Sequence, residues 1–249
     1  MYNNKITSIE TDIGRFTTLR ELDIEDNIID FLPTEIGKLE GLQRLFISEN
    51  NIPMIPTEIG LLSNLEILQT SKNSLGLMPT EIGKLTSLFQ LQSYGSDLAL
   101  IPTEIGRLDS LEELYLNDNE LLSLPTEIGR LTNLKRIHLG SNKLSLVPTE
   151  IGKLTNLKEI KLESNLLAAL PTEMGQLTNL TSLNLKKNQL EGTLPSEIGN
   201  LQELSLFGVE FSGLTGSIPS AVCESSSIST ILRDCDIEEC DCCSAQCLA

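Results

Sequence analysis

The chain has few of the features that mark an enzyme, a membrane protein or a nucleic-acid-binding protein. It contains no tryptophan, and aromatic residues make up 4% of its 249 residues. No apolar run approaches the roughly 18 residues that a membrane-spanning helix needs. The net charge of −17 argues against nucleic-acid binding, which requires a basic surface. Because 40% of the residues are hydrophobic, the chain can bury a core, and leucine and isoleucine must fill it.

Catalytic signatures are missing as well. The sequence has no HExxH motif, no GxGxxG motif, no phosphate-binding loop and no zinc spacing that includes histidine. Its one histidine, His138, is expected on an exposed strand, where a lone histidine is more often a contact residue than a base. We therefore expect no enzyme activity, no cofactor and no metal ion.

An internal repeat dominates the sequence. Its general form is LxxLxLxxNxLxxLPxEIGxLxx, and the step between successive copies is 23 residues, lengthening to 24 in the last units. The motif Pro-Thr-Glu-Ile-Gly, or its variant, begins at Pro33, Pro56, Pro79, Pro102, Pro125, Pro148, Pro171, Pro195 and Pro219. Such regularity is typical of a solenoid in which each unit packs on the next.

Each repeat predicts one short strand and one short turn. The alternation Leu22-Asp23-Ile24 has strand periodicity, and parallel stacking of such strands at roughly 4.8 Å would close a continuous core. The Pro-Thr-Glu-Ile-Gly segment predicts a helical or 3₁₀ turn in which threonine caps the start and glycine ends it. At two neighbouring inward positions, Thr70 and Ser93 replace leucine or isoleucine, and we expect their hydroxyls to bond each other.

One asparagine recurs where the chain leaves each strand. A buried asparagine must satisfy its amide, and the bent backbone beside it offers partners. We interpret this column as a structural ladder rather than a ligand site; it comprises Asn27, Asn50, Asn73, Asn119, Asn142, Asn165 and Asn188.

These motifs resemble the leucine-rich repeat family over nearly the whole chain. The resemblance implies an α/β solenoid, a right-handed horseshoe with a parallel concave sheet and short helical or 3₁₀ turns on the convex side. We predict a solenoid of about nine full repeats over residues 1–222, its first repeat truncated, and a cysteine-rich C-terminal cap over 223–249. The chain starts in mid-repeat with neither a polar cap nor a signal peptide, which favours a fragment of a longer protein.

All six cysteines lie in the predicted cap. An even number at the exposed end of a solenoid indicates disulfides, although a thiolate metal cluster or free thiols remain alternatives. The tail is similar to that of leucine-rich repeat proteins of diatoms and related algae. The candidate disulfide residues are Cys223, Cys235, Cys240, Cys242, Cys243 and Cys247.

The family signals for location are divided. The 23-residue units resemble intracellular Ras-group repeats, whereas the last units carry an LxGx(I/L)P form similar to plant extracellular repeats. Disulfides would require an oxidising compartment. We predict a secreted or cell-surface protein, such as a receptor-like ectodomain in signalling, with a cytoplasmic Ras-group-like scaffold as the alternative.

Outward strand positions vary from repeat to repeat, unlike the rest of the unit, and are therefore free to bind. An exposed row of aromatic and polar residues on a rigid concave sheet is typical of a protein-binding surface, with unselected drift as the alternative. The expected partner is a protein or peptide. The candidate ligand-binding residues are Phe46, Ile67, Gln69, Gln92, Tyr94, Tyr115, Asn117, His138 and Lys161.

A second kind of surface offers further alternatives. The regular threonine column of the convex turns, from Thr34 to Thr172, could present evenly spaced hydroxyls to ice or polysaccharide. The plant-type repeats also resemble those of enzyme inhibitors. Capping of the turns explains the same threonines more simply.

Overall fold

The protein is described by a computed structural model covering residues 4–216 and 218–233. The chain divides into two compact units, residues 1–121 and 122–249. In the described ranges no helix has the length and apolar character needed to cross a membrane.

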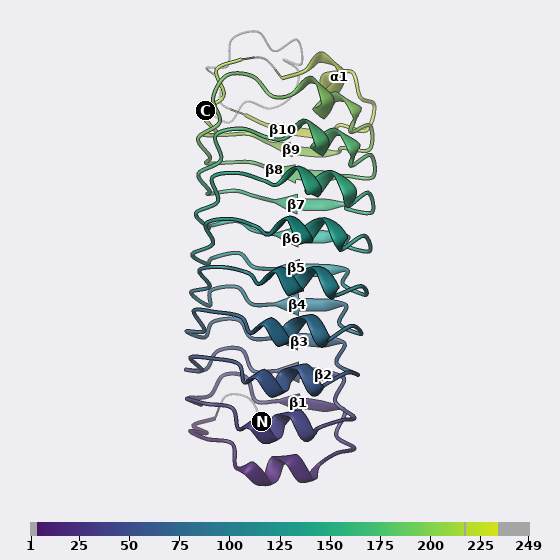
Figure 1. Ribbon diagram of the computed structural model, residues 1–249. Helices are drawn as coiled ribbons and strands as arrows, with labels where there is room; N and C mark the ends of the chain where they lie inside the picture. Colours follow the sequence, from purple (N-terminus) through teal and green to yellow (C-terminus); the bar gives the residue numbers. More distant parts are fainter. Residues whose placement is uncertain (1–3, 217, 234–249) are drawn as a thin grey trace. The chain divides into compact units, whose positions relative to one another are not determined.

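Unit 1 is a stack of repeats with short parallel strands on one side and 3₁₀ turns on the other (Figure 1). Its strands pair in sequence order, and each residue pairs with the residue one repeat away, as in Leu22 with Leu45. The strands are β1 (Glu21–Asp23), β2 (Arg44–Phe46), β3 (Ile67–Gln69), β4 (Gln90–Gln92) and β5 (Glu113–Tyr115). The turns are η1 (Thr11–Arg15), η2 (Thr34–Lys38), η3 (Thr57–Leu61), η4 (Thr80–Lys84) and η5 (Thr103–Arg107).

Unit 2 repeats this arrangement. Its parallel strands are β6 (Arg136–His138), β7 (Glu159–Lys161), β8 (Ser182–Asn184), β9 (Leu206–Gly208) and β10 (Thr230–Leu232). Its turns are η6 (Thr126–Arg130), η7 (Thr149–Lys153), η8 (Thr172–Gln176) and η9 (Ser196–Asn200), and one helical turn, α1 (Ser220–Cys223), takes the place of the last. The predicted fold class, a leucine-rich repeat solenoid with a parallel sheet and 3₁₀ turns, is confirmed.

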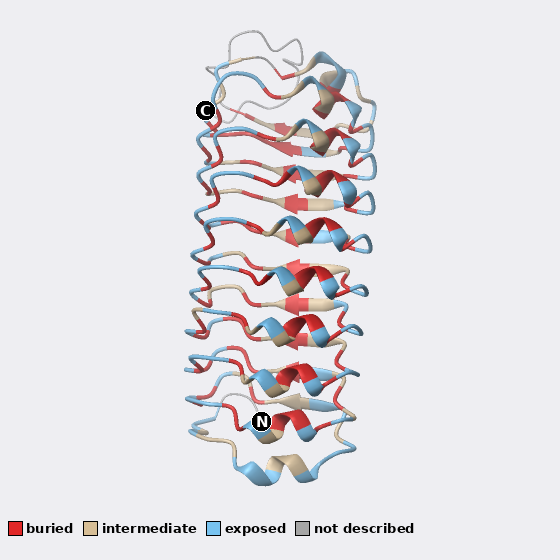
Figure 2. Cartoon of the chain, viewed as in Figure 1, coloured by how far each residue is buried: buried red, intermediate tan, exposed pale blue. Residues whose placement is uncertain are grey.

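The core of each unit consists mainly of aliphatic side chains that point inward from strand, loop and turn, and Phe207 of β9 in unit 2 is also fully buried. Leu45 of β2 and Ile59 of η3 are fully buried, and equivalent residues repeat along the unit (Figure 2). Each repeat contributes one thin layer of the core, and leucine and isoleucine fill that layer. Large aromatic side chains are therefore not needed. This packing accounts for the low aromatic content.

The ladder asparagines join neighbouring repeats through their backbones. The side-chain oxygen of Asn50 accepts a bond from Ile29 N of the preceding repeat at 3.0 Å. Its side-chain nitrogen donates to Ile24 O of that repeat at 3.0 Å and to Ile47 O of its own at 3.1 Å. Asn73 makes the same contacts one repeat later. One buried amide thus satisfies polar groups on two turns of the chain.

The ladder is interrupted once in unit 1. Ser96 occupies the asparagine position, and its hydroxyl donates to Thr70 O of the preceding repeat at 3.2 Å. Beside it, the hydroxyl of Thr70 donates to the hydroxyl of Ser93 at 2.8 Å, and both side chains are buried. The predicted bond between the two inward hydroxyls is therefore confirmed.

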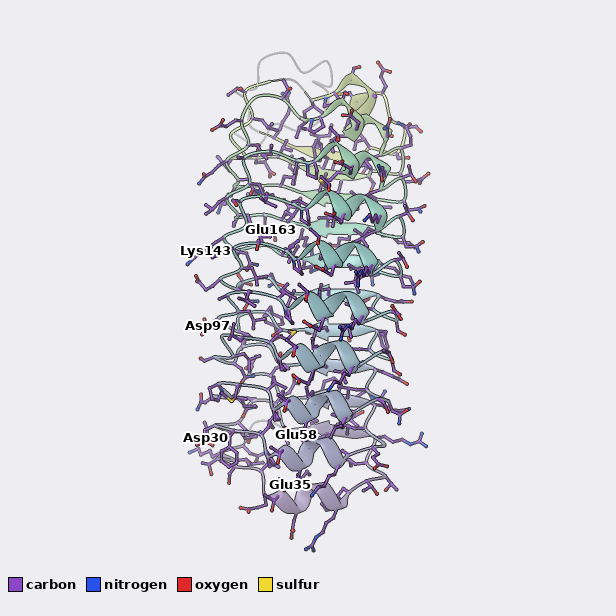
Figure 3. All side chains as sticks on the ribbon, in the orientation of Figure 1. Asp30, Glu35, Glu58, Asp97, Lys143 and Glu163 are labelled. Carbon is purple, nitrogen blue, oxygen red and sulfur yellow. The ribbon has the colours of Figure 1, made fainter. Side chains whose placement is uncertain are left out.

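The roles expected for threonine and glycine in the turns were wrong. None of the described 3₁₀ turns has a side-chain capping bond. In η2 proline holds the N-cap position, and the hydroxyl of Thr34 contacts the carboxylate of Glu35 at 3.4 Å. Gly37 lies inside the turn, which ends at the next residue. A Cβ on Gly37 would lie 2.7 Å from the backbone oxygen of Glu58 in the next repeat. Glycine is required because successive turns touch. Figure 3 shows Glu35 and Glu58 on these two turns.

The C-terminal part of the described chain continues the repeat pattern past residue 222. Strand β10 pairs with β9, and Arg233 directly after it is buried. Cys223 at the end of α1 is disulfide-bonded. The other candidate disulfide residues, Cys235, Cys240, Cys242, Cys243 and Cys247, lie outside the described residues, so the predicted framework as a whole stays a prediction.

The ladder predicts a sharp difference between two adjacent asparagines. Replacing Asn50 with alanine leaves buried backbone groups of two repeats without partners, which should lower the free energy of unfolding by about 2–3 kcal/mol. Asn51 is exposed, so Asn51→Ala should cost less than about 0.5 kcal/mol. Urea denaturation of both variants measures the difference. Equal losses would contradict the structural role of Asn50.

Candidate functional site

The solvent-facing side of the sheet carries the predicted ligand-binding residues. We call it the strand face. In each unit it consists of the first and third residues of every strand, together with the residue two positions after the end of that strand. In unit 1 most of these side chains are partly exposed, whereas Ser48 and Ser71 are buried. The predicted residues placed there are Phe46, Ile67, Gln69, Gln92, Tyr94, Tyr115 and Asn117.

Parallel pairing in register places these residues in rows across the strands. Phe46 of β2 pairs with Gln69 of β3, and Gln92 of β4 pairs with Tyr115 of β5. The backbone nitrogen of Tyr94 donates to the buried hydroxyl of Ser71, one repeat earlier, at 3.2 Å. Partly exposed aromatic rings are therefore held on a backbone that is fixed by bonds to its neighbours.

One carboxylate organises the far end of this face in unit 1. Oε2 of Glu113 accepts bonds from Tyr115 Oη at 3.0 Å and from Gln90 Nε2 at 2.8 Å. Reasoning from the sequence did not select Glu113. The sequence places Glu113 on a strand, but it does not show which neighbouring side chains Glu113 bonds.

The first four repeats of unit 1 line an open pocket on the strand face, at the carboxyl ends of the strands. Its volume is about 520 Å³, within the range of ligand-binding pockets. Of the predicted residues, it brings together Gln69 and Tyr94. The remaining lining residues were not predicted, although the acidic run around β1 was visible in the sequence; they are Asp23, Glu25, Asp26, Ser48 and Glu49.

In unit 2 the predicted residues His138 and Lys161 converge on one carboxylate. Oε1 of Glu159 lies 3.3 Å from His138 Nε2 and 3.0 Å from Lys161 Nζ, and its Oε2 lies 3.8 Å from Arg136 Nε. Two cationic side chains, Arg136 and Lys161, and one histidine thus surround one carboxylate. Glu159 was also not predicted.

The environment shifts two pKa values in this cluster. Burial lowers the pKa of His138, and the positive charge of Lys161 adds to that effect, while Glu159 opposes it. For Glu159, burial alone would raise the pKa, but the hydrogen bond and charge of Lys161 outweigh burial and lower it. His138 is therefore neutral near pH 7. Among the described residues, no group of His, Cys, Asp and Glu is arranged to hold a metal ion.

The repeat geometry agrees with the comparisons to known proteins. Residues 3–99 and 94–191 match the family described as leucine-rich repeat region. The chain belongs to the leucine-rich repeat family. No curated protein sequence matches it.

Solved structures of leucine-rich repeat proteins are similar to this chain. A leucine-rich repeat protein of Leptospira interrogans is 31% identical with a TM-score of 0.82, and the match covers 94% of this chain and 66% of that one. The plant peptide hormone receptor RGFR1, in complex with RGF2, is 34% identical with a TM-score of 0.84, over 94% of this chain and 40% of the receptor. The chain thus spans less than two thirds of either relative.

A third relative is the Arabidopsis receptor kinase HAESA, in complex with the peptide hormone IDA and the co-receptor SERK1. It is 30% identical with a TM-score of 0.76, over 94% of this chain and 45% of the receptor. The leucine-rich repeat fold typically provides a scaffold for binding, and its similarity to peptide-receptor ectodomains supports peptide or protein recognition in general terms.

The His138 cluster predicts a specific pH dependence of stability. The pKa of His138 is lowered in the folded state, so the unfolded chain takes up the proton first, near pH 6.5. The neutral form of His138 therefore favours the folded state above that pH. This contribution to the free energy of unfolding is lost as the pH falls toward the pKa of His138 in the folded protein. Unfolding free energies between pH 7 and pH 5 should therefore decline less steeply in His138→Gln than in the unmodified protein.

A second variant provides the control for this pH dependence. Glu159 raises the pKa of His138, so Glu159→Gln should lower that pKa further and make the decline at least as steep as in the unmodified protein. Three identical pH profiles would show that His138 does not couple to stability.

Proposed function

We propose that this chain recognises a peptide or protein ligand through its strand face, without catalysis. The observation that carries the proposal is the contrast between the two sides of each repeat. The turn side repeats nearly the same residues, as stacking requires, whereas the strand face changes in every repeat and presents partly exposed aromatic rings. Rigid aromatic residues surrounded by polar groups are typical anchors of binding surfaces.

The proposed contact residues of unit 1 are Phe46, Ile67, Gln69, Gln92, Tyr94, Tyr115 and Asn117, and those of unit 2 are His138 and Lys161. Peptide hormones are bound by the plant receptors that this chain resembles, which supports a peptide as the ligand class. The volume of the pocket beside Tyr94 is sufficient for one or two side chains of such a ligand.

The ligand-binding proposal is tested by selecting random peptides, displayed on phage, on the folded chain. Removing the two anchors together in Tyr94→Ala/Tyr115→Ala should weaken the selected peptides by more than about 2 kcal/mol, or roughly 30-fold. The matched control is Phe16→Ala/Leu61→Ala, which removes two exposed apolar side chains from the turn side of the same unit. A loss of affinity in the control alone, or in neither variant, would contradict recognition by the strand face.

We further propose that the chain works outside the cell, in a secreted or receptor-like protein. Similarity to plant receptor ectodomains, the plant-type LxGx(I/L)P units and the cysteine-rich tail support this location. Titration of free thiols on unreduced protein from its native source should find few or none of the six. Six free thiols would place the chain in a reducing compartment instead.

A further inference from the structure

The pocket on the strand face of unit 1 has a chemical character of its own. Four carboxylates line it, those of Asp23, Glu25, Asp26 and Glu49, and none of its lining residues is basic. The only aromatic residue in the lining is Tyr94. A hollow with acidic walls and one aromatic ring is complementary to a positively charged organic group.

The negative charge in this pocket is only partly compensated. Oε1 of Glu49 is paired with Lys72 Nζ at 2.6 Å, and the hydrogen bond and charge of Glu49 raise the pKa of that lysine. Oδ1 of Asp23 accepts a bond from the backbone of Glu25 at 3.2 Å. Within the described part of the chain, neither Glu25 nor Asp26 has a cationic partner. Two carboxylates therefore remain available to a charged ligand.

A buried hydroxyl provides a second, independent indication of a ligand. Ser48 lines the pocket although it is only 7% exposed. Its hydroxyl makes no hydrogen bond to any described residue, whereas Ser71, at the equivalent position of the next repeat, accepts a bond from Tyr94 N. Because Ser48 belongs to the lining, its hydroxyl can accept a bond from a group that enters the pocket. Here a ligand in the pocket would supply the missing donor.

We propose that this pocket binds an arginine side chain of the peptide ligand. A guanidinium carries five N–H donors in a plane and prefers several acceptors around it. The carboxylates of Glu25 and Asp26, the Ser48 hydroxyl and the Gln69 amide oxygen provide such acceptors, and the Tyr94 ring provides an aromatic surface. The described carboxylates are not clustered tightly enough to form a metal site, which favours an extended organic cation over a metal ion.

This inference rests on the proposed function but is tested without knowledge of the natural ligand. The probe is N-acetyl-arginine methylamide, titrated into the isotopically labelled chain at about 150 mM salt, where general attraction to an acidic surface is screened. Backbone amide shifts are expected to be saturable and confined to the residues that line the pocket. The citrulline analogue, which has nearly the same shape and no charge, should bind at least tenfold more weakly.

Two variants with equal loss of charge locate the site. Glu25→Gln/Asp26→Asn should weaken the arginine probe at least fivefold. Glu81→Gln/Glu104→Gln removes the same charge from turns η4 and η5 of the same unit and should leave the affinity unchanged. Ser48→Ala should weaken the probe about threefold. Equal binding of citrulline, or equal loss in both double variants, would overturn the proposal, as would saturation of the same amides by calcium at lower concentration.

The outcome separates this inference from the proposed function. If selected peptides lose affinity in Tyr94→Ala/Tyr115→Ala but show no enrichment of arginine and bind Glu25→Gln/Asp26→Asn normally, recognition by the strand face stands and the arginine pocket is wrong. If the arginine probe binds as expected but no peptide is selected on the strand face, the pocket is a cation site and peptide recognition is wrong.

Discussion

The described strands are only three residues long, too short to be stable alone, so each repeat depends on the one beside it. The contact that fixes this dependence is the buried asparagine that follows most of the described strands, with Ser96 in its place after β4. Asn50 bonds backbone groups of its own repeat and of the preceding one, which holds both bends at a constant separation. Parallel register, the aliphatic layers and the rows of side chains on the strand face all follow from this regular spacing.

Repetition explains which features could be predicted from the sequence. A residue type that returns every 23 positions must meet the same environment each time, so strand position, inward side chains and ladder were readable without a structure. The bond between Thr70 and Ser93 was also predictable, because register places equivalent positions of neighbouring repeats side by side. Threonine and glycine in the turns were misinterpreted because rules for isolated helix ends ignore the adjacent turn, which leaves no room for a side chain at Gly37.

The strand face was predictable in position but not in chemistry. Its residues do not repeat, so the sequence indicates which side chains are outside but not which of them meet. Glu113 and Glu159 are central to local networks because of particular neighbours one repeat away. The pocket in unit 1 combines residues that lie in or shortly after four different strands, and only folding brings Glu25 and Tyr94 to one hollow. The strand face thus carries acidic groups around the pocket of unit 1 and two cationic side chains around Glu159 in unit 2.

The close contact between successive turns has a consequence for how such a chain can change over time. The glycine of one turn meets the backbone of the next in the same way at Gly37 and Gly60 of unit 1 and at Gly129 and Gly152 of unit 2. Each repeat therefore presents an almost identical upper and lower surface. Duplication or deletion of one whole repeat in the gene would join surfaces that already fit, so the number of repeats can evolve without redesign of the core. A new copy would add one more row of side chains to the strand face, and selection could act on those side chains.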